Sequence, residues 1–178
     1  ELIAWAKANP GAGYATAGIG TSNHLIGAYL NKELGLDISH VPYRSGGLAT
    51  GAAVAGEVPI VIDQISTVLP FLTSGKLKAI AVTSPKRSQL LPEIPSITES
   101  VLPSIKFDSY QALFAPAGLP PELVHKLNDA IRKALSDPEI RKRHLELVLN
   151  SSEEFTAWLR ETSPRWQELV TLSGAKVE

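Results

Sequence analysis

The sequence has no cysteine, no methionine and few aromatic residues, which make up 6% of its 178 residues. Without cysteine the chain forms no disulfide, no zinc–thiolate or iron–sulfur centre and no thiol nucleophile, although this leaves its redox compartment open. Because it starts at Glu1 without an initiator methionine, we expect a processed or partial chain whose signal peptide would lie outside this sequence.

The sequence also lacks an excess of charge of either sign and any long apolar run. The chain carries 17 basic and 18 acidic residues, a net charge of −1, so it has no general attraction for nucleic acid or an anionic membrane surface. No apolar run approaches the roughly 18 residues of a membrane-spanning helix. The composition, 44% apolar and 20% charged, is typical of a globular protein with one domain or two small ones.

Short β-like runs alternate with helix-length segments over the first half of the chain. This alternation is typical of βα units and a mainly parallel sheet, and it therefore predicts the α/β class. Strands are expected at residues 14–17, 38–43, 58–63 and 77–83. Helices are expected at residues 1–9, 22–34, 48–55 and 65–73. Glycine follows three of these helices, where a left-handed residue ends a helix, at Gly35, Gly56 and Gly75.

The second half of the chain has a different pattern. Residues 84–103 contain four prolines and predict a long surface connection with one helical turn near residues 97–101. Residues 105–116 are extended in character, and we interpret them as a crossing between two structural units. Three more helices are expected, opening at Pro121, at Pro138 and at the Ser151–Glu154 capping box. Pro164 is expected to kink the last helix or to split it in two.

The segments that follow the predicted strands are the most informative, because ligands bind at the carboxyl ends of the strands in open parallel sheets. These segments are Gly18 to His24, Tyr43 to Gly47, Asp63-Gln64 and Thr83-Ser84. All four carry groups that form hydrogen bonds, and we expect them to lie along one edge of the sheet.

The first of these segments, GIGTSNH at residues 18–24, has the features of an anion site. Two glycines permit a tight turn, Thr21 or Ser22 supplies an N-cap hydroxyl, and the first N–H groups of the helix are available to a carboxylate or a phosphate. A tight turn with a satisfied cap would have the same sequence, so both interpretations stay open. The segment is neither a P-loop nor a dinucleotide fingerprint, because no Gly-Lys follows and Asn23 occupies the last glycine position.

Side chains with chemical function are few. His24 lies in the first turn of a helix, where a lone histidine is more often structural than catalytic, and His40 lies inside a strand. The sequence contains no Gly-x-Ser-x-Gly elbow after a strand, the motif that would indicate a serine hydrolase. Arg44 offers a guanidinium fork that suits a carboxylate, and Asp63 either accepts a hydrogen bond from a ligand or caps the helix that begins at Ile65. The sequence predicts no metal site and no cofactor.

Several motifs taken together indicate a family. In chain order they are YATAGIGTSNHL at residues 14–25, HVPYRSGG at 40–47, GKLKAIAVTS at 75–84 followed by KRS at 86–88, LPEIP at 91–95 and LFAPAG at 113–118. In this order, over essentially the whole chain, they resemble the Bug/TctC family, the periplasmic solute receptors of tripartite tricarboxylate transporters.

The resemblance implies a type II periplasmic-binding-protein fold, the Venus flytrap, in which two hinged lobes close on a small carboxylate. Such a receptor is periplasmic and monomeric, is not an enzyme, has no nucleic-acid partner and delivers its ligand to the membrane permease subunits of the transporter. Residues 1–106 would form the second ligand-binding lobe. Residues 107–178 would form the crossover and the C-terminal helices of the first lobe, whose N-terminal half is absent. We therefore expect these 178 residues alone to bind ligand weakly or not at all.

The resemblance also implies ligand-facing residues by matching position. They are Gly18, Gly20, Thr21, Ser22, His24, Tyr43 and Asp63. The chain departs from the family pattern at Ala52, where Asp is common, at Tyr110, where Trp is usual, and at residues 145–150, which are shorter than usual. The first departure leaves open whether the ligand carries an amine.

Two other function classes stay open on the residues alone. One is an α/β enzyme, such as a transferase or isomerase, that acts on a carboxylated or phosphorylated metabolite at the same crevice. The other is a ligand-sensing regulatory domain. An enzyme needs a positioned acid or base, and the sequence offers only His24 and Asp63 without a companion. We therefore expect a receptor that binds without catalysis.

Overall fold

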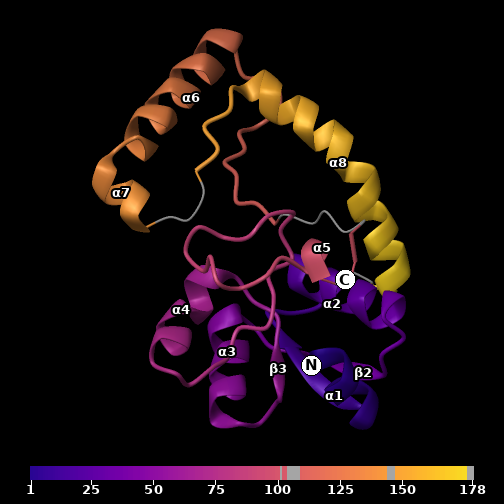
Figure 1. The fold of residues 1–178 in the computed structure, drawn as a ribbon. Coiled ribbons are helices and arrows are strands. Elements are labelled where there is room, and N and C mark those ends of the chain that lie inside the picture. The colour runs from indigo at the N-terminus through magenta and orange to yellow at the C-terminus, as the bar shows by residue number, and fades with distance from the viewer. Residues whose placement is uncertain (101, 104–108, 144–146, 176–178) are drawn as a thin grey trace. The chain divides into compact units, whose positions relative to one another are not determined.

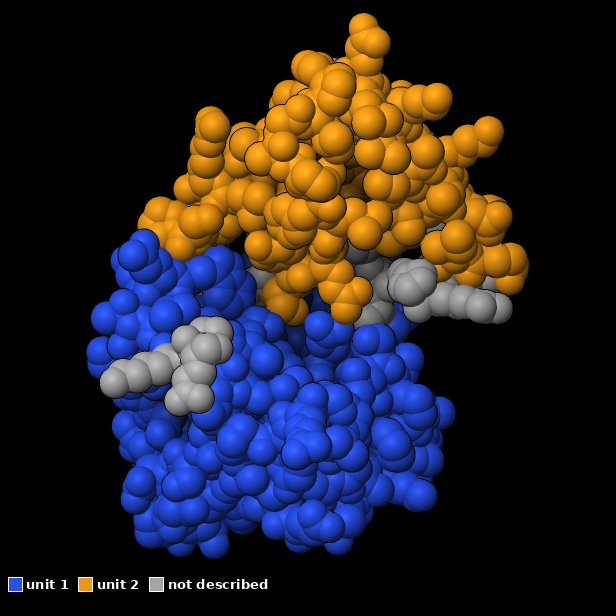
Figure 2. Space-filling view, turned by 180° about the vertical axis from the view of Figure 1, so that it is seen from behind, with its two compact units in different colours: residues 1–108, 165–178 blue, residues 109–164 orange. Residues whose placement is uncertain are grey.

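The structure, a computed structural model, describes residues 1–100, 102–103, 109–143 and 147–175 (Figure 1). Its elements in chain order are α1 (Leu2–Ala8), β1 (Ala12–Thr16), α2 (Ser22–Glu33), β2 (Ile38–Pro42), α3 (Gly46–Ala55), β3 (Ile60–Val61), α4 (Ile65–Thr73), α5 (Ile97–Ser100), α6 (Pro121–Leu135), α7 (Pro138–Arg143) and α8 (Ser152–Ser173). Two compact units divide the chain: unit 1 is Glu1–Asp108 with Arg165–Glu178, and unit 2 is Ser109–Pro164 (Figure 2).

Unit 1 is built on a three-stranded sheet with the order β2-β1-β3. Its strands pair in parallel, as the sequence predicts. In register, Tyr14 of β1 pairs with His40 of β2 and with Ile60 of β3. The third strand is shorter than the expected 58–63, because Pro59 has no N–H to donate to a neighbouring strand. One hydrogen bond continues the ladder beyond β3, from the N–H of Ile62 to the carbonyl of Ala15 at 3.0 Å.

Helices pack against both faces of this sheet. On one face Tyr14 contacts Ala6 of α1, and a Cβ added to Gly27 of α2 would overlap the Tyr14 ring, so glycine permits the close approach of α2. On the other face Ala15 packs with Ala49 of α3. Because successive residues of a strand point to opposite faces, burial on both sides explains the nearly continuous apolar character of these strands.

The prediction of a fourth strand at residues 77–83 is wrong. Only Val82 pairs, in an isolated parallel bridge with Ser96, and the segments meet through two hydrogen bonds of 3.0 and 2.8 Å. The physical reason lies in the pairing segment, where Pro92 and Pro95 lack the N–H groups that a longer ladder needs. The run is therefore a connection rather than part of the sheet.

Unit 1 includes Arg165–Glu178, which the resemblance groups with residues 107–164. Leu169 in the last turns of α8 is only 2% exposed and packs with Leu25 of α2 and Ile97 of α5. Burial of such a side chain typically stabilises a fold by about 1.5–3 kcal/mol, so this contact anchors the end of α8 to unit 1.

Unit 2 contains α6, α7 and the first part of α8. The predicted capping box is confirmed: the Ser151 N–H donates to Glu154 Oε2 at 2.8 Å, and the Glu154 N–H donates to Ser151 Oγ at 3.1 Å. Within the same unit, the ring of Tyr110 meets the ring of Trp158 edge-on, with ring centroids 4.8 Å apart. The expected split at Pro164 does not occur, since α8 continues through it as one helix.

Several expectations fall partly on residues outside the described ranges. These are residue 101 of the expected helical turn, residues 105–108 of the expected crossing, and residues 145–146 of the segment before the capping box. Residues 109–116 form neither helix nor strand. In the part of the chain that the structure covers, no helix has both the length and the apolar character to cross a membrane.

Candidate ligand-binding site

Three helices begin where the three strands end, at one edge of the sheet. β1 leads to α2, β2 to α3 and β3 to α4, and the strands are parallel. Because the strand order is β2-β1-β3, the chain passes from β1 to β2 on one side of β1 and then crosses to β3 on the other side. In open α/β sheets the ligand crevice lies where the strand order reverses in this way. Thr83-Ser84 does not join this edge as a strand end, since Ser96 Oγ instead donates to the Ser84 carbonyl at 2.5 Å.

The turn between β1 and α2 depends on its two glycines. Gly18 and Gly20 have φ values of 127° and 78°, a region that side-chain-bearing residues rarely adopt. Thr21 is the N-cap of α2: its Oγ1 accepts from the His24 N–H at 3.4 Å and donates to the Gly18 carbonyl at 2.7 Å. Of the two cap residues left open by the sequence, the structure therefore selects Thr21.

Several N–H groups of this turn already have partners. The Gly18 N–H donates to Thr16 Oγ1 at 3.3 Å, and the Gly20 N–H donates to His24 Nδ1 at 3.2 Å. The N–H groups of Ser22 and Asn23, the first two of α2, have no hydrogen-bond partner among the described residues. Both N–H groups are available to an anion, and the positive end of the helix dipole favours one there.

His24 is buried and carries its proton on a defined nitrogen. Because Nδ1 accepts from the Gly20 N–H, the neutral ring holds its proton on Nε2. Burial lowers the pKa of His24 below its usual value, so the ring is neutral at pH 7. Its Nε2–H has no partner among the described residues and is a second kind of donor beside the helix terminus.

His40, for which the sequence predicts a place inside a strand and no role, stacks on His24. The two ring centroids lie 4.0 Å apart with an interplanar angle of 24°, and His40 Nε2 lies 2.6 Å from Thr16 Oγ1. Burial, and secondly the charge of His24, lower the pKa of His40 to about 4. The period of two along β2 places His40 on the sheet face that α2 covers, and this was the available signal for the contact.

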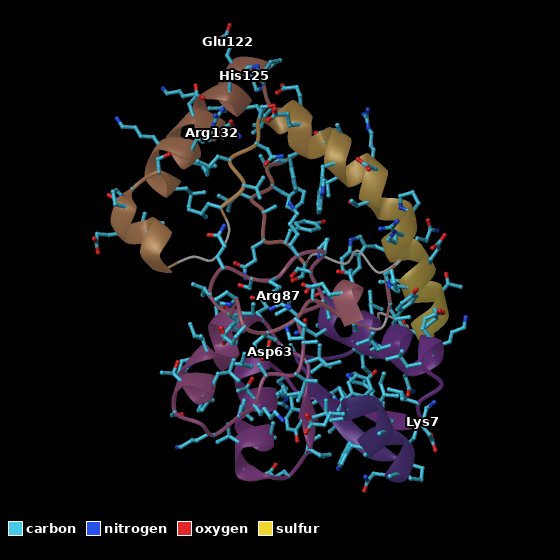
Figure 3. All side chains as sticks on the ribbon, in the orientation of Figure 1. Lys7, Asp63, Arg87, Glu122, His125 and Arg132 are labelled. Atoms are coloured by element: carbon cyan, nitrogen blue, oxygen red, sulfur yellow. The ribbon has the colours of Figure 1, made fainter. Side chains whose placement is uncertain are left out.

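Asp63, labelled in Figure 3, accepts hydrogen bonds from α2, from α3 and from the N-cap residue of α4. Its Oδ1 accepts from the Gln64 N–H at 2.8 Å and from Asn23 Nδ2 at 3.3 Å, and its Oδ2 accepts from Thr50 Oγ1 at 2.9 Å. A Cβ on Gly46 would lie 2.5 Å from Oδ2, so glycine leaves space for the carboxylate. Asp63 is predicted as a site residue from the sequence, but its two side-chain donors are not, because they lie 40 and 13 residues away in the chain.

Tyr43 reaches the site through its backbone. Its N–H donates to the Thr16 carbonyl at 3.0 Å, and its own carbonyl lies 3.3 Å from the position of a Cβ on Gly18. The half-buried side chain packs with the apolar cluster around Ala15, on the face opposite to His40. Arg44, which follows it, is exposed.

The structure therefore joins most of the predicted positions into one network. Gly18, Gly20, Thr21 and His24 are linked by hydrogen bonds, and Asn23 connects this turn to Asp63. The His, Asp and Glu side chains in the described ranges form no group of three that could hold a metal ion. What the arrangement offers is a set of neutral donors at a helix start, which suits capture of an anion.

An open parallel α/β sheet with hydrogen-bond donors beyond the carboxyl ends of its strands is typical of ligand-binding proteins. The sequence model of the tripartite tricarboxylate transporter family receptor, TctC, matches residues 1–174. The chain belongs to this family. Among curated relatives, a UPF0065 protein of Pseudomonas sp. strain P51 is 33% identical over 96% of this chain and 52% of its own length.

Solved structures agree with this assignment. The periplasmic binding protein BugD is 31% identical, with a TM-score of 0.87 over 99% of this chain and 62% of BugD. MatC from Rhodopseudomonas palustris, solved with bound malate, is 29% identical, with a TM-score of 0.80 over 95% of this chain and 60% of MatC. The periplasmic-binding-protein fold that the resemblance implies is confirmed. The chain spans about half the length of the curated relatives it matches.

Proposed function

We propose that this chain is the ligand-capturing part of an extracytoplasmic receptor that binds a small carboxylate and delivers it to a tripartite tricarboxylate transporter. Family membership and the malate bound by MatC support a carboxylate. The observation that carries the proposal is the pair of N–H groups on Ser22 and Asn23, which have no partner among the described residues and begin α2 at the sheet edge.

The chemistry of these donors fits a carboxylate. One carboxylate oxygen accepts from the two N–H groups, and the neutral His24 donates from Nε2 to the same ligand. A hydrogen bond to a charged group is worth about 1.5–3 kcal/mol, and the helix dipole adds about 0.3–1 kcal/mol. Gly18, Gly20 and Thr21 hold the turn in shape, while Tyr43 and Asp63 border it.

In this proposal Asp63 does not bind the carboxylate group of the ligand. It is an anion, and three donors already bind its oxygens. In the proposal it orients Asn23 and faces the uncharged or donor part of the ligand, such as a hydroxyl group. This arrangement binds without catalysis, in line with a family of solute-binding proteins.

We also propose that unit 2 contributes to the other lobe in a protein of the relatives' length. Three apolar side chains of unit 2 are largely exposed: Leu113 by 75%, Phe114 by 70% and Val148 by 77%. Exposed apolar groups of this kind often mark a surface that another part of a protein covers. The unmatched part of the relatives is long enough to cover this face. The complete receptor is proposed to be monomeric and periplasmic and to meet the permease subunits of its transporter.

The test is a binding panel on the full product of the gene that encodes this chain. Calorimetry with malate and citrate is compared with malate dimethyl ester, which keeps the skeleton of malate but not its charges, and proton NMR follows each ligand for turnover. Saturable binding of a free carboxylate, no binding of the ester and no conversion are expected. Conversion of any ligand would support the enzyme alternative, and failure of every carboxylate to bind would overturn the proposal.

A further inference from the structure

Both glycines of the turn between β1 and α2 are connected to a histidine. The Gly20 N–H donates directly to His24 Nδ1 at 3.2 Å. Gly18 is connected through Thr16, whose Oγ1 accepts from the Gly18 N–H at 3.3 Å and lies 3.4 Å from the Gly18 carbonyl and 2.6 Å from His40 Nε2. The two rings then stack on each other at 4.0 Å. The turn is thus closed into a loop of contacts that passes through His40.

The surroundings of His40 fix its ring from several directions. Thr16, its hydrogen-bond partner, is completely buried, and Tyr14 lies with its ring centroid 5.1 Å from that of His40. With Nε2 engaged by Thr16 and the ring in contact with two other aromatic rings, His40 is suited to hold its neighbours rather than to contact a ligand.

From this geometry we infer that His40 is a positioning residue for the ligand site, an inference that rests on the proposed function. Its ring keeps the His24 imidazole in the orientation in which Nδ1 accepts from Gly20. The Nε2–H of His24 and the N–H groups of Ser22 and Asn23 then stay directed to the ligand. His40 acts on binding only through this turn.

Three substitutions separate the contacts of His40 in the full gene product. His40→Phe keeps a flat ring but removes the bond to Thr16, His40→Gln keeps a polar group but removes the stack, and Thr16→Val removes the hydroxyl with little change of shape. Each is expected to weaken malate binding by roughly 10-fold. His125→Gln, on an exposed histidine of unit 2, is the control and is expected to bind malate like the wild type.

A double-mutant cycle distinguishes positioning from a general loss of stability. If His40 acts through His24, His24→Gln combined with His40→Phe weakens malate binding no further than His24→Gln alone. Losses that add in full would overturn the inference, as would wild-type malate binding by all three single variants. Thermal unfolding identifies any variant that fails to fold, and such a variant is replaced by another of the three.

A second readout does not depend on ligand binding. In nitrogen-15 spectra of the imidazole rings, wild-type His24 is expected to show an unprotonated Nδ1 and a protonated Nε2. In His40→Phe a mixture of tautomers is expected, together with faster amide exchange at Gly20. If no carboxylate binds, the proposed function fails while this readout still tests His40. An unchanged His24 tautomer and unchanged Gly20 exchange would contradict the positioning role.

Discussion

Lowering the pH from 7.5 to 5.0 is expected to destabilise unit 1, in part through His40. Burial and the charge of His24 lower the pKa of His40 to about 4 in the folded chain, whereas an exposed histidine has a pKa of about 6.5. The unfolded state therefore binds a proton below pH 6.5 that the folded state does not bind until about pH 4. Stability is full above pH 6.5 and falls as the pH falls through this window.

The magnitude follows from the two pKa values. At pH 5.0, protonation of the unfolded histidine alone would stabilise the unfolded state by about 2 kcal/mol relative to the folded state. Because the ring is only partly buried, solvent screens the charge, and we expect about 1 kcal/mol from His40. The lowered pKa of His24 acts in the same direction.

The assay is urea unfolding followed by far-ultraviolet circular dichroism at pH 7.5 and 5.0, for the wild type and for His40→Gln. Groups distant from position 40 titrate alike in both proteins and cancel in the comparison, so the difference reports His40 together with any change at His24, which it contacts. The variant is expected to lose about 1 kcal/mol less than the wild type between the two pH values. Equal losses in both proteins, or a larger loss in the variant, would refute this reasoning.

Two further predictions concern packing, and both are measured by urea unfolding. Gly46→Ala places a Cβ 2.5 Å from Asp63 Oδ2 and is expected to cost about 1–3 kcal/mol. A Cβ on the adjacent Gly47, in the same helix, would have no atom within 4 Å, so Gly47→Ala should stabilise the chain by about 0.5–1 kcal/mol. Similar effects on the free energy of unfolding at the two positions would contradict this account. Leu169→Ala is expected to cost about 2–4 kcal/mol, because this side chain is 2% exposed. A loss below 1 kcal/mol would mean that the end of α8 does not anchor to unit 1.

Local signals in the sequence predicted much of unit 1. The helix at residues 65–73 has the predicted bounds, because its apolar period, its start after a strand and its end near Gly75 are all encoded within a few residues. The alternation of strands and helices likewise predicted the parallel sheet. The strand expected at residues 77–83 failed because a strand also needs a partner with N–H groups, and its neighbouring segment is rich in proline.

The candidate site was predicted as a list of positions but not as a network. Glycine, Thr21 and His24 carry local signals for a turn and a cap, and these signals were readable. The stack of His24 on His40 and the bond from Thr50 to Asp63 join separate elements. Such contacts follow from strand register and helix placement, which a single sequence does not contain.

The most direct test of the account is calorimetry of malate binding to Ser22→Pro in the full gene product. Proline removes one of the two N–H donors without breaking α2, since it is favoured at the first position of a helix, and the preceding Thr21 already has the extended φ and ψ of −69° and 155° that proline requires. Ser152→Pro makes the same change at the first residue of α8 and serves as the control. We predict that Ser22→Pro weakens malate binding about 10-fold or more while Ser152→Pro leaves it unchanged. Wild-type affinity in Ser22→Pro would contradict capture of the carboxylate by the start of α2.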